Sequence, residues 1–334
     1  MFLCLFFLYN IYVINIFMGV VQLHKVKKDI AYGGKSFLSV VYSYRYLYIL
    51  MLPGLLYFII FKYAPIYGLQ LAFKNYKAGL GISGSPWVGA EHFINLFSSD
   101  GFLTAFKNTI IISLLKVICG FPLPVILTLL INELRGAKTK RVLQTVYTFP
   151  HFLSWVIVSG MCFSLFNSDG VVNQLITVLG GEKQQLLTEP KTFRGFLVFT
   201  AMWKESGWGT ILYLAAVTSI DASIYEAAKI DGAGRWQSML HITLPGISSM
   251  IIVNLILSCG NVMDAGFDQI FNMYNSSVMQ VSDILDTFVY RISFKQTPNF
   301  GFSTAVGLFK GVANLVILLS INKLVKLTGK EGIV

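Results

Sequence analysis

Long apolar segments separated by polar connections dominate this sequence of 334 residues. Apolar residues make up 55% of the chain and charged residues 13%, and the mean hydropathy of +0.66 is too high for a soluble domain of this length. A helix needs about 20 mostly apolar residues to cross a bilayer. Six segments meet this requirement, at about 46–66, 106–132, 142–166, 195–219, 244–264 and 303–325. The sequence therefore predicts an all-α, polytopic membrane protein in a lipid bilayer.

The net charge of +10 would be compatible with nucleic-acid binding, but its distribution argues against such a partner. If residue 45 lies inside, the inner segments carry more lysines and arginines than the longer outer loops. This bias follows the positive-inside rule. It predicts that the connection at 221–245 lies in the cytoplasm.

The beginning of the chain allows two interpretations. Residues 2–23 are uncharged, and basic residues follow this stretch instead of preceding it, which argues against a cleaved signal peptide. One interpretation is that this stretch is a seventh span. The other, which we favour, is that the chain starts at Met18 and residues 1–17 are not part of it. We expect residues 1–44 to form an N-terminal hydrophobic and basic cytoplasmic segment, and 45–334 to form the transmembrane domain.

The connection at 221–245 is a polar region between two apolar segments. Good helix formers run from Glu226 to Lys229, Gly232 permits a sharp reversal, and Arg235 to Ile242 can form a second helix that Pro245 ends. Two short helices at an angle form a rigid unit that can transmit a movement of a soluble partner. The alternative is an amphipathic helix on the lipid headgroups, but the charges are mixed in sign and lack a basic face.

The spacing of this connection resembles the signature loop in the membrane subunits of bacterial ABC importers. Asp231, Ala233 and the ending Ile-Thr-Leu-Pro further resemble the carbohydrate permeases of the maltose-permease superfamily. The segments 63–76 and 85–97 are similar to oligosaccharide permeases. The resemblance implies ATPase-coupling roles for Glu226, Ala227, Ala228, Asp231, Gly232, Ile242, Leu244 and Pro245.

The resemblance also implies the fold and the partners. The expected fold is the six-helix permease core of a type I importer, multi-pass in the bacterial cell membrane. The expected partners are a second homologous permease subunit, two cytoplasmic ATPase subunits, an extracytoplasmic sugar-binding lipoprotein and an oligosaccharide. This chain itself needs no cofactor, because ATP and Mg would be bound by the ATPase subunits.

Polar and aromatic residues within the fourth predicted span are candidates for the substrate pathway. Trp203, Glu205 and Trp208 combine a costly intramembrane charge with indole rings, which stack well on the apolar faces of sugars. The alternative is that Lys204 reaches outward and the tryptophans anchor the span at the interface.

In the second span, Pro122 and Pro124 should bend or break the helix, for gating or for packing.

The fifth predicted span adds a polar face. Asn254, Ser258, Asn261 and Asp264 are spaced by three or four residues, which places them along one side of a helix. The resemblance implies that they contact the transported sugar, most directly in the case of Ser258. Hydrogen bonds between helices remain the alternative.

Motifs of other protein classes are missing from the sequence. Residues 34–36 end like a phosphate-binding loop, but Asp29 stands where that motif needs glycine, and the four cysteines have no metal-ligand spacing. No catalytic cluster is visible, so we expect a transporter subunit and not an enzyme.

A permease for a non-sugar solute is the first alternative function, and an ion-coupled secondary transporter is a weaker one. The sugar is left open: Glu205 and Asp264 could bind hydroxyl groups, whereas Lys204 and Arg291 could bind an acidic sugar.

Overall fold

A computed structural model describes residues 42, 44–134, 136–295, 297–329 and 332. These residues form helices joined by turns, with one isolated β-bridge between Lys74 and Trp87. Four helical segments are long and apolar enough to cross a membrane, or up to six if each of two bent helix pairs counts as one span. The predicted all-α, polytopic fold is therefore confirmed. Residues 2–23 and the alternative start at Met18 lie outside the described part of the chain.

The chain divides into two units, of which the first comprises residues 1–71 and 80–84. Its main element is α4 (Arg45–Phe58), which continues through a π turn (Ile59–Tyr63) into a 3-10 helix (Ala64–Phe73), whose last two residues belong to the second unit. Together they form an apolar segment of 29 residues that contains the predicted span 46–66. Two short helical turns follow, at Ala78–Leu80 and at α5 (Gly81–Gly84).

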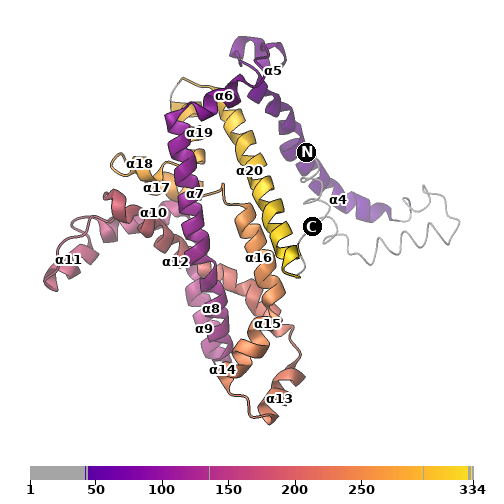
Figure 1. Cartoon of the computed structure of the whole chain (residues 1–334), viewed down its shortest axis with the longest axis vertical. Helices are drawn as coiled ribbons and strands as arrows, with labels where there is room; N and C mark the ends of the chain where they lie inside the picture. The colour runs from indigo at the N-terminus through magenta and orange to yellow at the C-terminus, as the bar shows by residue number, and fades with distance from the viewer. Residues whose placement is uncertain (1–41, 43, 135, 296, 330–331, 333–334) are drawn as a thin grey trace. The chain divides into compact units, whose positions relative to one another are not determined.

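The second unit comprises residues 72–79 and 85–334 and holds all the candidate site residues. It begins with α6 (Glu91–Phe97) and α7 (Asp100–Gly120), which runs on into α8 (Pro122–Asn132). Figure 1 shows α7 and α8 as consecutive parts of one long helical path. The break falls at Phe121, whose backbone keeps helical angles, because Pro122 and Pro124 cannot donate hydrogen bonds to the preceding turn. The expected effect of the prolines is thus a local break within a span of 33 residues.

The third predicted span, 142–166, is broken. The α9 helix (Ala137–Thr148) passes into a 3-10 turn (Phe149–Phe152), and α10 (Trp155–Phe166) then starts anew. Ser154 caps this second helix, because its hydroxyl accepts a hydrogen bond from the amide of Ile157 at 3.3 Å. The shorter α11 (Val171–Val178) follows α10.

The rest of the unit contains the helices on either side of the connection at 221–245. The α12 helix (Pro190–Thr218) has 29 residues and precedes α13 (Ala222–Ile230). After the turn come α14 (Arg235–Ser238), a π turn (Met239–Thr243), α15 (Leu244–Gly246) and α16 (Ser248–Gly260). The chain ends with α17 (Phe267–Met273), α18 (Met279–Ser282), α19 (Leu285–Tyr290), a π turn (Arg291–Lys295) and α20 (Phe300–Leu327).

Three apolar clusters hold the second unit together. The first joins α12 to α17 around Phe193 and Leu197, and the second packs Phe102 of α7 against Phe288 and against residues of α20. The third cluster joins α8 and α12 to the connection through Tyr213, Met239 and Ile247. The third cluster therefore packs the connection against both helices.

Candidate functional site

The connection at 221–245, which we call the coupling loop, forms two helical arms at one end of the unit (Figure 1). Its first arm is bent by 71° from α12, and its second arm, Arg235–Gly246, is bent by 57° from α16. Asp221 caps the first arm, accepting a hydrogen bond from the amide of Ser223 at 2.9 Å. That bond lowers the pKa of the Asp221 carboxyl, so the cap is ionised at neutral pH and is lost only as the pH falls through the lowered value.

Gly232 makes the reversal between the arms with a φ of +81°. The amide of Ala233 donates to the carbonyl of Ala228 at 2.9 Å, and the amide of Gly232 donates to the carbonyl of Lys229 at 3.2 Å. This pair of bonds is the Schellman motif, in which a left-handed residue ends a helix. Glycine is favoured at this position because it adopts positive φ without strain.

The two arms are tied together near their base. The hydroxyl of Tyr225 hydrogen bonds the hydroxyl of Thr243 at 2.9 Å, which fixes the first arm to the second. The second arm contains the expected helix, but it widens into a π turn at Met239–Thr243 and runs through Pro245 to Gly246. Pro245 therefore lies within the helical path and does not end it.

The coupling candidates divide by exposure. Glu226, Ala227, Asp231, Gly232 and Pro245 are exposed, whereas Ala228, Ile242 and Leu244 are partly buried. Sequence reasoning missed Ile230 and Trp236, which are 87% and 69% exposed at the turn between the arms. The described part of the chain leaves both side chains largely uncovered. Their signal in the sequence was the presence of an Ile and a Trp within a polar region.

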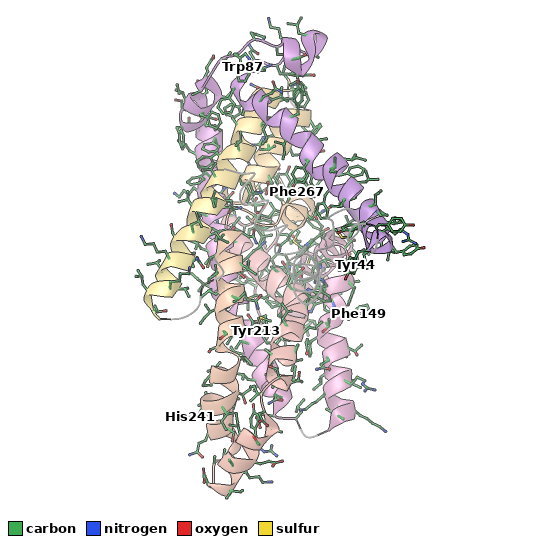
Figure 2. All side chains as sticks on the ribbon, turned by 90° about the vertical axis from the view of Figure 1, so that its right-hand side faces the viewer. Tyr44, Trp87, Phe149, Tyr213, His241 and Phe267 are labelled. Atoms are coloured by element: carbon green, nitrogen blue, oxygen red, sulfur yellow. The ribbon has the colours of Figure 1, made fainter. Side chains whose placement is uncertain are left out.

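A cavity of about 460 Å³ lies where α7, α8, α10, α12, α16 and α17 converge. Four of the predicted pathway residues line it: Glu205, Asn254, Ser258 and Asp264. Its wall also contains Lys116, Trp155, Tyr213 and Gln269, which the sequence analysis did not select. Figure 2 places His241 of the coupling loop near one end of the unit, with Tyr213 farther along and Phe267 farther still.

Three predicted pathway residues do not line this cavity. Trp203 and Trp208 are 42% and 48% exposed at the surface of α12, and the ring of Trp208 stacks on that of His151 with centroids 4.5 Å apart. Asn261 follows α16, which ends at Gly260, so the expected helical face does not continue through Asn261 and Asp264. Asp264 still reaches the cavity because the following loop turns back to it.

The charged residues of the fourth span form a compact network. The Glu205 carboxylate contacts Nδ1 of His151 at 2.7 Å and Nζ of Lys204 at 3.1 Å. Nζ of Lys204 also donates to the carbonyl of His151 at 2.7 Å. Lys204 is buried, so it does not reach outward as the alternative interpretation supposed. The network joins α12 to the 3-10 turn after α9.

A second charged group surrounds the loop after α16. Nζ of Lys310 contacts carboxylate oxygens of Asp264 at 2.5 Å and of Asp286 at 2.6 Å. The other oxygen of Asp264 accepts a hydrogen bond from the side-chain amide of Asn314 at 3.2 Å. These contacts attach the loop to α19 and α20.

Comparisons with known proteins identify the family. Residues 120–328 match the family described as "Binding-protein-dependent transport system inner membrane component". The chain is 45% identical over 300 residues to the polygalacturonan/rhamnogalacturonan transport system permease protein YteP of Bacillus subtilis, covering 90% of this chain and 93% of that protein. It is 44% identical to protein LplB of the same organism over 301 residues, covering 90% of this chain and 94% of LplB.

A solved structure gives the same result. A chain of a bacterial alginate ABC transporter, crystallised in complex with an alginate pentasaccharide-bound periplasmic protein, superposes with a TM-score of 0.81. That chain is 36% identical, and the match covers 90% of this chain and all of the other. The expectations of an ABC importer permease, multi-pass in the inner membrane and without catalytic function of its own, are thereby confirmed. The chain belongs to the family of binding-protein-dependent transport system inner membrane components.

Proposed function

We propose that this subunit forms part of the translocation pathway for an oligosaccharide and receives its driving force from cytoplasmic ATPase subunits at the coupling loop. The observation that carries the proposal is the continuity between the loop and the cavity. The first arm follows α12, which supplies Glu205 and Tyr213 to the cavity wall, and the second arm leads into α16, which supplies Asn254 and Ser258. A displacement of the loop therefore acts on two walls of the cavity at once.

The proposed partners complete the transporter. A second homologous permease would supply the other half of the pathway, and an extracytoplasmic binding protein would deliver the sugar. ATP and Mg would be held by two ATPase subunits. The names of the polygalacturonan/rhamnogalacturonan permease and of the alginate transporter support an oligosaccharide as cargo.

Co-purification followed by reconstitution tests the proposal. The tagged subunit, isolated from its native host, should bring down an ATPase and a second permease. In lipid vesicles, the complex should hydrolyse ATP faster when the binding protein and tri-galacturonate are added together than when either is added alone. Uptake that needs an ion gradient and no ATPase would refute the proposal.

Reversal of the charge on Glu226 should disrupt coupling without disturbing the fold. Glu226 is exposed on α13, and among the described residues its carboxylate makes no hydrogen bond or ion pair, so Glu226→Lys removes no polar side-chain contact with them. If Glu226 faces a basic group of an ATPase, the change replaces attraction by repulsion, and co-purification of the ATPase should fall by about tenfold or more.

The control for Glu226→Lys is the same reversal elsewhere on the surface. Glu182→Lys changes an exposed carboxylate outside the coupling loop and should leave ATPase binding unchanged. Equal ATPase recovery with both variants would exclude Glu226 from the contact.

A further inference from the structure

The cavity wall contains a lysine whose direct hydrogen-bond partners are all neutral. Nζ of Lys116, on α7, donates to the carbonyl of Ala265 at 2.6 Å and to the side-chain oxygen of Gln269. Among the described residues no carboxylate lies within ion-pair distance of this nitrogen. An ammonium group has three N–H donors, so one remains for a ligand.

Each carboxylate that lines the cavity is already paired with a lysine. Glu205 pairs with Lys204 and also contacts Nδ1 of His151, and Asp264 pairs with Lys310. Lys310 also pairs with Asp286, so one lysine is shared by two carboxylates. The net negative charge of this group makes that side of the cavity unfavourable for an anion. Lys116 has no direct ion pair and interacts with Glu205 only from beyond ion-pair distance. It is therefore the cation of the cavity wall that a ligand carboxylate can pair with directly.

The loop beside Lys116 is shaped around its ammonium group. Gly266 has a φ of +93°, and a Cβ atom at this position would lie 3.0 Å from Nζ of Lys116. The left-handed glycine thus lets the carbonyl of Ala265 and the side chain of Gln269 reach the same nitrogen. Gln269 is in turn fixed by its amide, which donates to the carbonyl of Leu197 at 2.7 Å and to the hydroxyl of Thr200 at 2.9 Å.

The other basic residues considered for an acidic sugar are already engaged. Lys204 is buried against Glu205 and the carbonyl of His151. Arg291 donates to both carboxylate oxygens of Asp283, at 3.0 and 2.6 Å, and Asp283 is buried. Neither residue lines the cavity, whereas Lys116 does.

We propose that Lys116 binds the carboxylate of a uronic acid unit of the transported oligosaccharide, so that this subunit itself favours acidic over neutral sugars. The inference rests on the proposed import function. Trp155 lines the same cavity. Nζ of Lys204 lies 5.4 Å from the centroid of its ring, so the opposite face of the indole is the one on which a sugar ring would stack. Selection between acidic and neutral sugars would then occur in the membrane subunit as well as in the separate binding protein.

The test compares two trisaccharides that differ at C6 alone. Tri-galacturonate carries carboxylates, and α-1,4-galactotriose carries hydroxymethyl groups. Their affinities for the purified complex are measured by equilibrium dialysis without the binding protein, so that only the membrane site discriminates. We expect the wild type to favour tri-galacturonate by about tenfold, Lys116→Met to lose that preference, and Lys116→Arg to keep most of it.

Two controls separate a binding role from a structural one. Lys107→Met removes an exposed charge from the same helix and should leave the ratio of affinities unchanged. The ratio does not depend on the amount of folded protein, so partial misfolding of Lys116→Met does not obscure the result. If Lys116 only holds the loop in place, Lys116→Met will weaken the binding of both sugars equally, which would contradict the inference.

The remaining outcomes distinguish the inference from the proposed function. A wild type that binds both sugars equally, or binds neither, overturns the uronate site. If such a complex still imports a neutral oligosaccharide at the expense of ATP, the proposed function stands. If it imports no oligosaccharide and recovers no ATPase, both proposals fail.

Discussion

Gly232→Pro is expected to abolish oligosaccharide-stimulated ATP hydrolysis while the subunit still inserts into the membrane. Gly232 has a φ of +81°, and proline is restricted to about −65°. Proline also lacks the N–H that donates to the carbonyl of Lys229. The substitution therefore removes the Schellman turn, and the two arms of the coupling loop lose their fixed angle.

The expected effect comes from the backbone conformation at position 232 and not from a steric clash of the new side chain. A Cβ atom at position 232 would have no heavy atom within 4 Å, so Gly232→Ala creates no clash. It does place alanine in the left-handed region, at a cost of about 1–2 kcal/mol. Asparagine tolerates that region better, so we expect stimulated hydrolysis to rank glycine, asparagine, alanine and proline in falling order.

Gly234→Ala is the matched control in the same loop. Gly234 has a φ of −73°, and the nearest atom to an added Cβ would be 3.7 Å away, so alanine fits. This variant should hydrolyse ATP like the wild type in the reconstituted complex. Normal stimulation in Gly232→Pro, measured in the same vesicles, would show that the turn does not transmit the movement.

Much of the fold could be predicted because membrane spans depend on local composition. Each of the six predicted apolar segments contains helical structure, and the reversal at Gly232 followed from good helix formers on one side and a glycine after them. The break at Leu153 and Ser154 was missed because mean hydropathy is insensitive to the hydrogen bond that caps α10. The end of α16 at Gly260 was missed for a related reason, since periodicity does not show where a helix stops.

The cavity was only partly predictable because it combines residues far apart in the sequence. Glu205 was found because an intramembrane charge is costly, and the same argument applied to Lys116 would have found it within the second predicted span. Trp203 and Trp208 have the right chemistry but lie on the exposed side of α12. The orientation of that helix is set by its neighbours and not by its own sequence.

Gly207→Ala is expected to cause the largest loss of stability in the second unit. A Cβ atom on Gly207 would lie 2.0 Å from the carbonyl oxygen of Tyr147 and 2.8 Å from Cα of Thr148. Both atoms belong to the backbone of α9, so no side-chain rotation relieves the overlap. The helices must separate, and we expect a loss of about 3 kcal/mol or more, at or above the upper end of typical overpacking costs.

Separation of α9 and α12 should also damage the site, because the same contact positions its charges. Thr210 of α12 hydrogen bonds the Tyr147 hydroxyl at 3.0 Å, and His151 lies only a few residues beyond Tyr147. A shift of α9 therefore moves His151 relative to Glu205. The measurement is the temperature at which the purified subunit loses its monodisperse peak in detergent.

Gly195→Ala distinguishes close packing from the general effect of replacing a glycine. Gly195 lies on the same helix, but an added Cβ would have no heavy atom within 4 Å. Alanine has the higher helix propensity, so this variant should unfold at the wild-type temperature or slightly above it. If both variants unfold alike, α9 and α12 do not pack backbone to backbone at Gly207, and the alignment of His151 with Glu205 needs another cause.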